Sequence, residues 1–99
     1  MATVLIPTPL RKFTGNLPKV TIPGNVIAEI ITNMVQQYPE MQKYLLDPSG
    51  TLRPFINIFV GQEDIRSLQA QSTEVNTHSV VSIVPAIAGG NYQSEEFNN

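Results

Sequence analysis

Apolar and polar residues alternate along several short segments of the chain, which is the pattern of β-strands that bury one face. We predict strands over residues 2–6, 19–22, 55–60 and 79–84, and the first two form a plausible hairpin around a long loop. The residues expected to face the core recur at every second position: Val4, Ile6, Val20, Ile22, Ile56, Ile58, Val60, Val81 and Ile83.

A different period marks residues 26–38. Apolar residues recur there about every four positions and form one stripe, which predicts a helix that buries a single side. Asn25 is expected to cap the helix at its N-terminus. Pro39 is expected to end it, because the residue before a proline avoids helical geometry.

The segments between these elements are expected to be mostly irregular. Pro7 and Pro9 argue against a helix in the first loop, residues 40–46 suggest a short helix, and residues 47–50 match a type I turn. Residues 65–75 are polar. The apolar anchors expected in these segments are Met41, Tyr44, Leu45, Ile65, Leu68 and Val75.

The order of strand, strand, helix, strand, irregular segment and strand predicts an α+β domain, in which one main helix covers one face of a sheet. The opposite face then carries apolar residues with no obvious cover, and such a face is a natural docking surface. Its expected members are Leu5, Phe55, Phe59, Val80 and Val84, of which we single out Phe55, Phe59 and Val84 as the partner-docking face.

Composition restricts the possible functions. The chain of 99 residues is 41% hydrophobic and 14% charged, which fits one globular domain, and a net charge of −2 without a basic cluster argues against nucleic acid as the main partner. It has no apolar run long enough for a membrane span and no signal sequence, so we expect a cytoplasmic protein with no membrane partner. With no cysteine and a single histidine, His78, a thiol nucleophile or a cysteine- or histidine-based metal site is excluded.

No combination of residues predicts catalysis. Glu63 and Asp64, next to Arg66, are adjacent on a turn and point apart, so a solvated loop is the better interpretation. His78 at the start of a strand has no partner in the chain and is better interpreted as a surface residue. The sequence lacks phosphate-binding, dinucleotide-binding and hydrolase motifs. We therefore expect a non-enzyme with no catalytic residue, no metal and no bound cofactor.

The last predicted strand runs directly into Pro85 and a pair of glycines, Gly89 and Gly90. Glycine pairs are common in loops, but this pair lies beyond the last core strand, where no turn is needed. A segment that ends in glycine can enter a narrow channel, because glycine has no Cβ to clash with the walls.

The segment VSIVPAIAGG at residues 81–90 resembles the terminal strand and diglycine arm of the MoaD/ThiS family of ubiquitin-like sulfur carriers. The similarity is closer to the cysteine-biosynthesis (CysO-like) subgroup. Segments similar to those of this subgroup are IPTPLR at 6–11 with TG at 14–15, LDPS at 46–49, and FINIFV at 55–60 followed by EDIR at 63–66. The resemblance covers residues 2–90 and implies a β-grasp fold, with a mixed sheet of four to five strands and one main helix.

The resemblance implies that the chain is a substrate of other enzymes. An adenylating (ThiF/MoeB-like) activating enzyme uses ATP to adenylate the carboxylate of Gly90, and a sulfur donor then replaces AMP to leave a thiocarboxylate. A pyridoxal-phosphate-dependent cysteine synthase supplies the acceptor, and a JAMM-type zinc peptidase releases the product. Pro85, Ile87, Ala88 and Gly89 are the residues that these enzymes would recognise in the arm.

The sequence departs from the family pattern in two places. Residues 76–78 replace the acidic-glycine turn that often precedes the last strand, so the contacts of that turn cannot be carried over. Residues 91–99 follow Gly90, and an internal amide cannot be adenylated. We therefore divide the chain into a carrier domain, 1–90, and a flexible extension, 91–99, and predict that a peptidase cleaves between Gly90 and Asn91.

Three other functions remain open. The chain could be the small subunit of molybdopterin synthase, a ubiquitin-like modifier joined to target lysines through Gly90, or a binding module whose open sheet face does all the work. The acceptor of the sulfur, its donor and the oligomeric state are not determined by the sequence.

Overall fold

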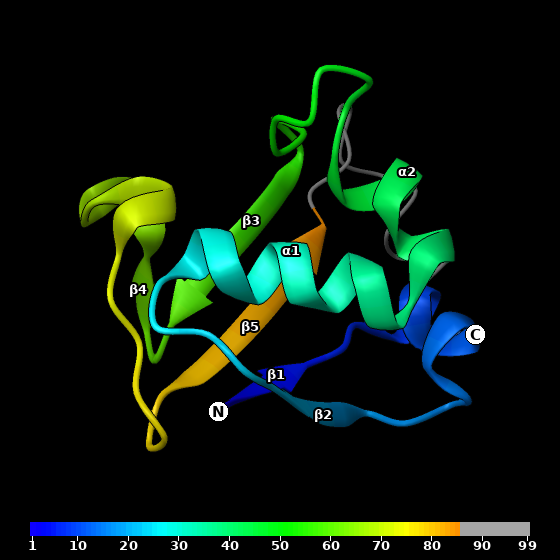
Figure 1. Ribbon diagram of the computed structural model, residues 1–99, viewed down its shortest axis with the longest axis horizontal. Helices are drawn as coiled ribbons and strands as arrows, with labels where there is room; N and C mark the ends of the chain where they lie inside the picture. Colours follow the sequence, from blue (N-terminus) through cyan, green and yellow to red (C-terminus); the bar gives the residue numbers. More distant parts are fainter. Residues whose placement is uncertain (86–99) are drawn as a thin grey trace.

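The computed structural model describes residues 1–85 as one mixed sheet with helices packed on one side (Figure 1). The strands are β1 (Ala2–Leu5), β2 (Lys19–Ile22), β3 (Ile56–Val60), β4 (Glu63–Asp64) and β5 (Val80–Pro85), and the α-helices are α1 (Ile27–Gln37) and α2 (Gln42–Leu45). Short 3-10 helices cover Thr8–Thr14, Pro39–Met41, Ile65–Ser67 and Ala70–Ser72.

The sheet has the order β2-β1-β5-β3-β4, which places the last strand at its centre. β1 and β5 pair in parallel, and β5 is antiparallel to β3 on its other side. β1 with β2, and β3 with β4, form antiparallel hairpins at the two edges. The α+β class, the first hairpin and the helix over one face are therefore confirmed. The strand β4 was not predicted, because Glu63 and Asp64 were expected to lie on a turn.

The core lies between α1 and the sheet, as the alternation predicts. Ile27, Ile30, Ile31 and Met34 are the buried residues of α1. The facing sheet residues that are at least nine-tenths buried are Ala2, Val4, Val20, Ile22, Ile56, Ile58, Val81 and Ile83. Ile6, directly after β1, is equally buried, and Val60 packs against them while half-buried. Burying one such aliphatic side chain contributes about 1.5–3 kcal/mol, so this apolar layer supplies most of the drive to fold.

The predicted cap at Asn25 is wrong. The helix begins one residue later, with Val26 in extended geometry at the N-cap and no capping side chain. The amide of Ile27 instead donates to the carbonyl of Thr73, 2.9 Å away, and the amide of Val75 donates to the carbonyl of Asn25 at the same distance. The distant segment thus satisfies the first amide of the helix, and the Glu29 side chain accepts the Asn25 amide at 2.7 Å.

The prolines in the first loop do not prevent a helix there. Pro7 and Pro9 lie at the cap and in the first turn of the Thr8–Thr14 helix, where a missing amide hydrogen costs little. The loop is then closed by the buried Thr14, whose Oγ1 lies 3.1 Å from the Arg11 carbonyl and 2.9 Å from the Leu17 carbonyl.

Two predicted anchors do not reach the core. Leu68 is 38% exposed and Tyr44 is 39% exposed, whereas Met41, Leu45, Ile65 and Val75 are buried. Tyr44 packs against Phe13 instead, with ring centroids 5.0 Å apart. The turn at residues 47–50 is confirmed by the hydrogen bond from the Gly50 amide to the Asp47 carbonyl, 2.9 Å long.

Candidate functional site

The strand that leads to the predicted diglycine arm is held on both sides. Within β5, Val81 pairs with Val4 of β1 and with Val60 of β3, and Pro85 pairs with Ile56. The arm therefore starts from the most firmly anchored strand of the sheet. The predicted arm and cleavage residues Ile87, Ala88, Gly89, Gly90 and Asn91 lie outside the described residues, so those assignments remain predictions.

The face of the sheet opposite α1 is open among the described residues. Side chains alternate across each strand, so the members of β5 on this face are Val80, Ser82 and Val84. Val80 is 40% exposed and Val84 is 43% exposed. Leu5 of β1 shares this face and is 38% exposed.

Two of the three predicted docking residues, Phe59 and Val84, share this face. Val84 pairs with Asn57 of β3, which makes Phe59 its diagonal neighbour across the two strands. Phe55 lies in the turn directly before β3. Phe55 is 52% exposed, and Phe59 is half-buried. We call Phe59 and Val84, together with the exposed Phe55 directly before β3, the open-face cluster.

The prediction of a docking face named only the apolar residues, although the alternation also assigns polar residues to it. Asn57 and Ser82 are half-buried on the same side as the open-face cluster, and Ser82 pairs with both Leu5 and Phe59. The alternation that identified Phe59 and Val84 also places these two residues there. They give a docking partner hydrogen-bonding groups among apolar side chains, a combination typical of protein interfaces.

The acidic residues considered as an acid/base pair have a structural role. Asp64 Oδ2 lies 3.1 Å from Arg66 Nη2, and Asp64 Oδ1 accepts the Arg66 amide at the start of a 3-10 helix. The hydrogen bond from the Arg66 side chain lowers the pKa of Asp64, and the same contact raises the pKa of Arg66. Because its pKa is lowered, ionised Asp64 stabilises the folded state at pH values above 3.8, the ordinary pKa of the group. This contribution is lost as the pH falls through the lowered pKa.

The other polar groups that the sequence suggested are also structural. The Ser49 side chain donates to Asp47 Oδ1 at 2.6 Å and lowers the pKa of Asp47, which fixes the turn before β3. His78 is exposed, and its amide donates to Asn76 Oδ1 in the turn before β5. Residues 1–85 hold no group of three or more histidine, aspartate or glutamate side chains arranged to bind a metal ion.

Membrane insertion finds no support in the helices of the described part. Neither α1 nor any other helix within residues 1–85 has the length and apolar character needed to cross a bilayer.

Comparison with known proteins gives consistent matches. The ThiS family matches residues 4–90. The sulfur carrier protein CysO of Mycobacterium tuberculosis is 38% identical over 90 residues, which cover 89% of this chain and 97% of that protein. CysO of Amycolatopsis orientalis, solved in a complex with BexX, matches with a TM-score of 0.81 and 34% identity over 91% of this chain and 100% of its own.

The fold is shared more widely than the sequence. The small archaeal modifier protein 1 of Methanosarcina acetivorans reaches a TM-score of 0.81 at 21% identity, over 90% of this chain and 95% of its own. The predicted β-grasp fold is therefore confirmed, as a five-stranded mixed sheet with α1 as its main helix. By its sequence and by its fold, this chain belongs to the ThiS family.

Proposed function

We propose that this chain is a sulfur carrier protein for cysteine or homocysteine biosynthesis, and that the sulfur is carried as a thiocarboxylate on Gly90. The observation that carries the proposal is where the family match stops: it covers residues 4–90 and ends on the second glycine. Support also comes from the 38% identity to the sulfur carrier protein CysO.

In the proposed reaction the chain is a co-substrate and other proteins are the catalysts. An oxygen of the Gly90 carboxylate attacks the α-phosphate of ATP on an activating enzyme, and pyrophosphate leaves. Sulfide then attacks the carbonyl of the acyl-adenylate, and AMP leaves with its electron pair. The product is a thiocarboxylate, whose ionised sulfur is a far better nucleophile than a carboxylate oxygen.

Later steps consume the thiocarboxylate. Its sulfur adds to an aminoacrylate that a pyridoxal-phosphate-dependent synthase provides. The acyl group then shifts from sulfur to nitrogen, and a zinc peptidase hydrolyses the new amide, which returns Gly90 to its carboxylate form. Within residues 1–85 no group takes part in these steps, and the role of the body is to hold the arm and to dock.

The body suits this role because docking and presentation use the same strand. Val84 belongs to the open-face cluster, and Pro85 follows it as the last residue of β5. An enzyme that docks on the open-face cluster would therefore lie beside the point where the arm begins. The Amycolatopsis orientalis relative, solved in a complex with BexX, supports partner binding as a property of such carriers.

The first test compares the chain 1–99 with a chain that ends at Gly90. We expect the shorter chain to gain the mass of one sulfur in place of one oxygen when it is incubated with the activating enzyme, ATP and a sulfide source. The full chain should stay unchanged until a zinc peptidase removes residues 91–99, because its Gly90 carbonyl is part of an amide. Intact-mass spectrometry reads both results.

The same experiment distinguishes the other functions. Sulfur transfer to a pterin precursor instead of an aminoacrylate would indicate the molybdopterin branch, and conjugates with lysine residues of other proteins would indicate a modifier. If the full chain forms the thiocarboxylate at the end of residue 99, or if no form of the chain is activated, the proposal that sulfur is carried on Gly90 is wrong.

Charge on the open-face cluster should weaken activation without unfolding the body. We expect Val84→Asp to raise the KM of the activating enzyme for the carrier by on the order of tenfold, because a buried charge at an interface centre is poorly tolerated. Val84 is 43% exposed, so the free energy of unfolding should change little.

The matched control is Thr32→Asp, which adds the same charge on the exposed side of α1. It should leave the KM unchanged. Equal effects of the two substitutions would show that net charge, and not the open-face cluster, controls activation.

A further inference from the structure

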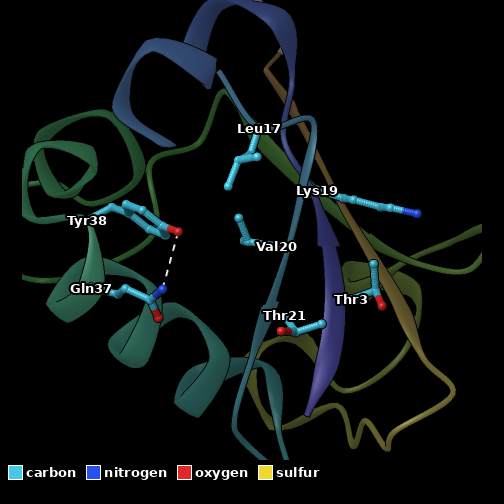
Figure 2. Close-up of a pocket in the computed structure, with 7 residues that line it drawn as sticks. All are labelled: Thr3, Leu17, Lys19, Val20, Thr21, Gln37 and Tyr38. Atoms are coloured by element: carbon cyan, nitrogen blue, oxygen red, sulfur yellow. Dashed lines mark hydrogen bonds between the residues drawn. The ribbon is translucent and has the colours of Figure 1, made fainter. Parts of the chain in front are cut away.

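Among residues 1–85, no strand pairs with the outer edge of β2, and a groove lies directly beside this edge. β2 is the first strand in the sheet order and has only β1 as a neighbour. The groove has a volume of about 520 Å³. It is lined by Thr3, Leu17, Lys19, Val20, Thr21, Gln37 and Tyr38 (Figure 2).

The register shows which backbone groups of β2 are free. The Ile6 amide donates to the Pro18 carbonyl at 2.8 Å, so the pairs Val4–Val20 and Ala2–Ile22 exchange the next ladder hydrogen bonds. The amides and carbonyls of Lys19 and Thr21 must then point away from β1. Within residues 1–85 no recorded hydrogen bond uses these four groups.

The free edge has defined ends. The Leu17 carbonyl accepts a hydrogen bond from Thr14 Oγ1 at 2.9 Å, and the Pro23 carbonyl accepts one from Asn33 Nδ2 at 2.7 Å. Pro18 and Pro23 have no amide hydrogen to offer. An added strand would therefore pair with Lys19 and Thr21 alone, so this edge can hold only a short segment.

The two sides of the edge differ in chemistry. Figure 2 shows Leu17 and Val20 on the same side as Tyr38, at the C-terminal end of α1, and Lys19 directed to the other side. Leu17 is 50% exposed there, whereas Val20 forms a buried floor. Gln37 Nε2 donates to Tyr38 Oη at 3.2 Å, which leaves the Tyr38 hydroxyl hydrogen free to donate to a ligand.

We propose that the β2 edge and this groove bind an extended segment of a partner protein, which pairs antiparallel to β2 with an apolar side chain opposite Val20 and an acidic side chain opposite Lys19. Successive side chains of a strand point to opposite faces, so one such segment places the apolar residue between Leu17 and Tyr38 and the acidic residue on the open side. Lys19 is the one charged residue that lines the described groove, and this favours an acidic partner.

The site does not include Val84 of the open-face cluster, because β1 separates β2 from β5. The inference does not depend on the sulfur carrier function.

The probe is the peptide acetyl-Ser-Val-Thr-Phe-Glu-Ser-amide, with Phe opposite Val20 and Glu opposite Lys19. Titration of the ¹⁵N-labelled chain should shift the amide signals of Lys19 and Thr21 and slow their hydrogen exchange. A methyl group on the Glu nitrogen should weaken binding about tenfold or more, since that amide donates to β2. A methyl group on the Phe nitrogen, which points away from β2, should have a much smaller effect.

Two variants of the chain complete the test. Thr21→Pro removes a free donor without breaking a ladder hydrogen bond and should weaken peptide binding about tenfold or more. Lys19→Glu should weaken it by roughly two- to fivefold, and a peptide with Lys in place of Glu should restore the loss. Lys43→Glu, on α2, is the matched control and should bind like the original chain.

Other outcomes would overturn the proposal. Equal effects of the two methylated peptides would exclude strand addition. Protection of Lys19 and Thr21 that grows with protein concentration, without peptide, would assign the edge to a second copy of the chain. Protection present in the chain 1–99 and absent from the chain 1–90 would assign it to the chain's own residues 91–99.

Discussion

Replacing Gly89 with valine is expected to abolish adenylation of the chain 1–90 while leaving the fold unchanged. The proposed arm must enter an active site in which Gly90 meets ATP, and a β-branched side chain one residue before the reacting carboxylate would clash with a channel shaped for glycine. A displacement of about 1 Å at a reacting centre lowers rates by about 10²-fold, so we expect a loss of at least that size. Pyrophosphate release in the presence of the activating enzyme measures it.

Two controls separate the arm from the body. Gly89→Ala should retain an intermediate rate because it adds a single methyl group, and Thr77→Val, in the exposed turn before β5, should be activated normally. Urea unfolding of all three variants should give free energies within about 0.5 kcal/mol of the original chain. A Gly89→Val chain that is activated normally would contradict the narrow channel, and one that unfolds would show that the arm is structural.

Replacing Ile58 with alanine should cost about 2–5 kcal/mol of unfolding free energy. Ile58 is 1% exposed, lies in β3 opposite Ile83 of β5, and belongs to the core beneath α1. The loss combines the lost burial of the removed atoms with the cavity they leave, and it is a large part of the 5–15 kcal/mol typical of a domain. Urea denaturation at constant pH measures it.

Leu68→Ala is the matched control, since it removes a similar volume from a leucine that is 38% exposed. It should cost less than about 1 kcal/mol. The sequence assigned Leu68 to the core and the structure does not, so this pair of variants tests the structure at the point where the two differ. A larger loss at Leu68 than at Ile58 would contradict the described core.

Local periodicity was enough to predict the body of the domain. The two-residue alternation in β1, β2, β3 and β5 identified which side chains face α1, because each strand buries one face only. The helix was equally clear from its stripe. The predictions that were wrong concern positions that depend on other segments of the chain. The start of α1 is set by the carbonyl of Thr73, and the position of Leu68 follows from the 3-10 helix that comes directly after β4.

The two candidate sites, the open-face cluster and the groove beside β2, also differ in how far the sequence predicts them. Alternation alone indicates that Phe59 and Val84 point away from the core, whereas their position next to each other depends on the pairing of β3 with β5. The groove beside β2 was not found, since it depends on the order of the strands. No local pattern shows that β2 lies at an edge while β5 lies at the centre.

The double pairing of β5 has a mechanical consequence. A pull on the C-terminal end of β5, directed along the strand, loads its hydrogen bonds to β1 and to β3 in shear, so they must break together and not one after another. Forced unfolding depends on the rate of that collective rupture. The domain should therefore stay folded when a partner pulls on the C-terminal end of this strand.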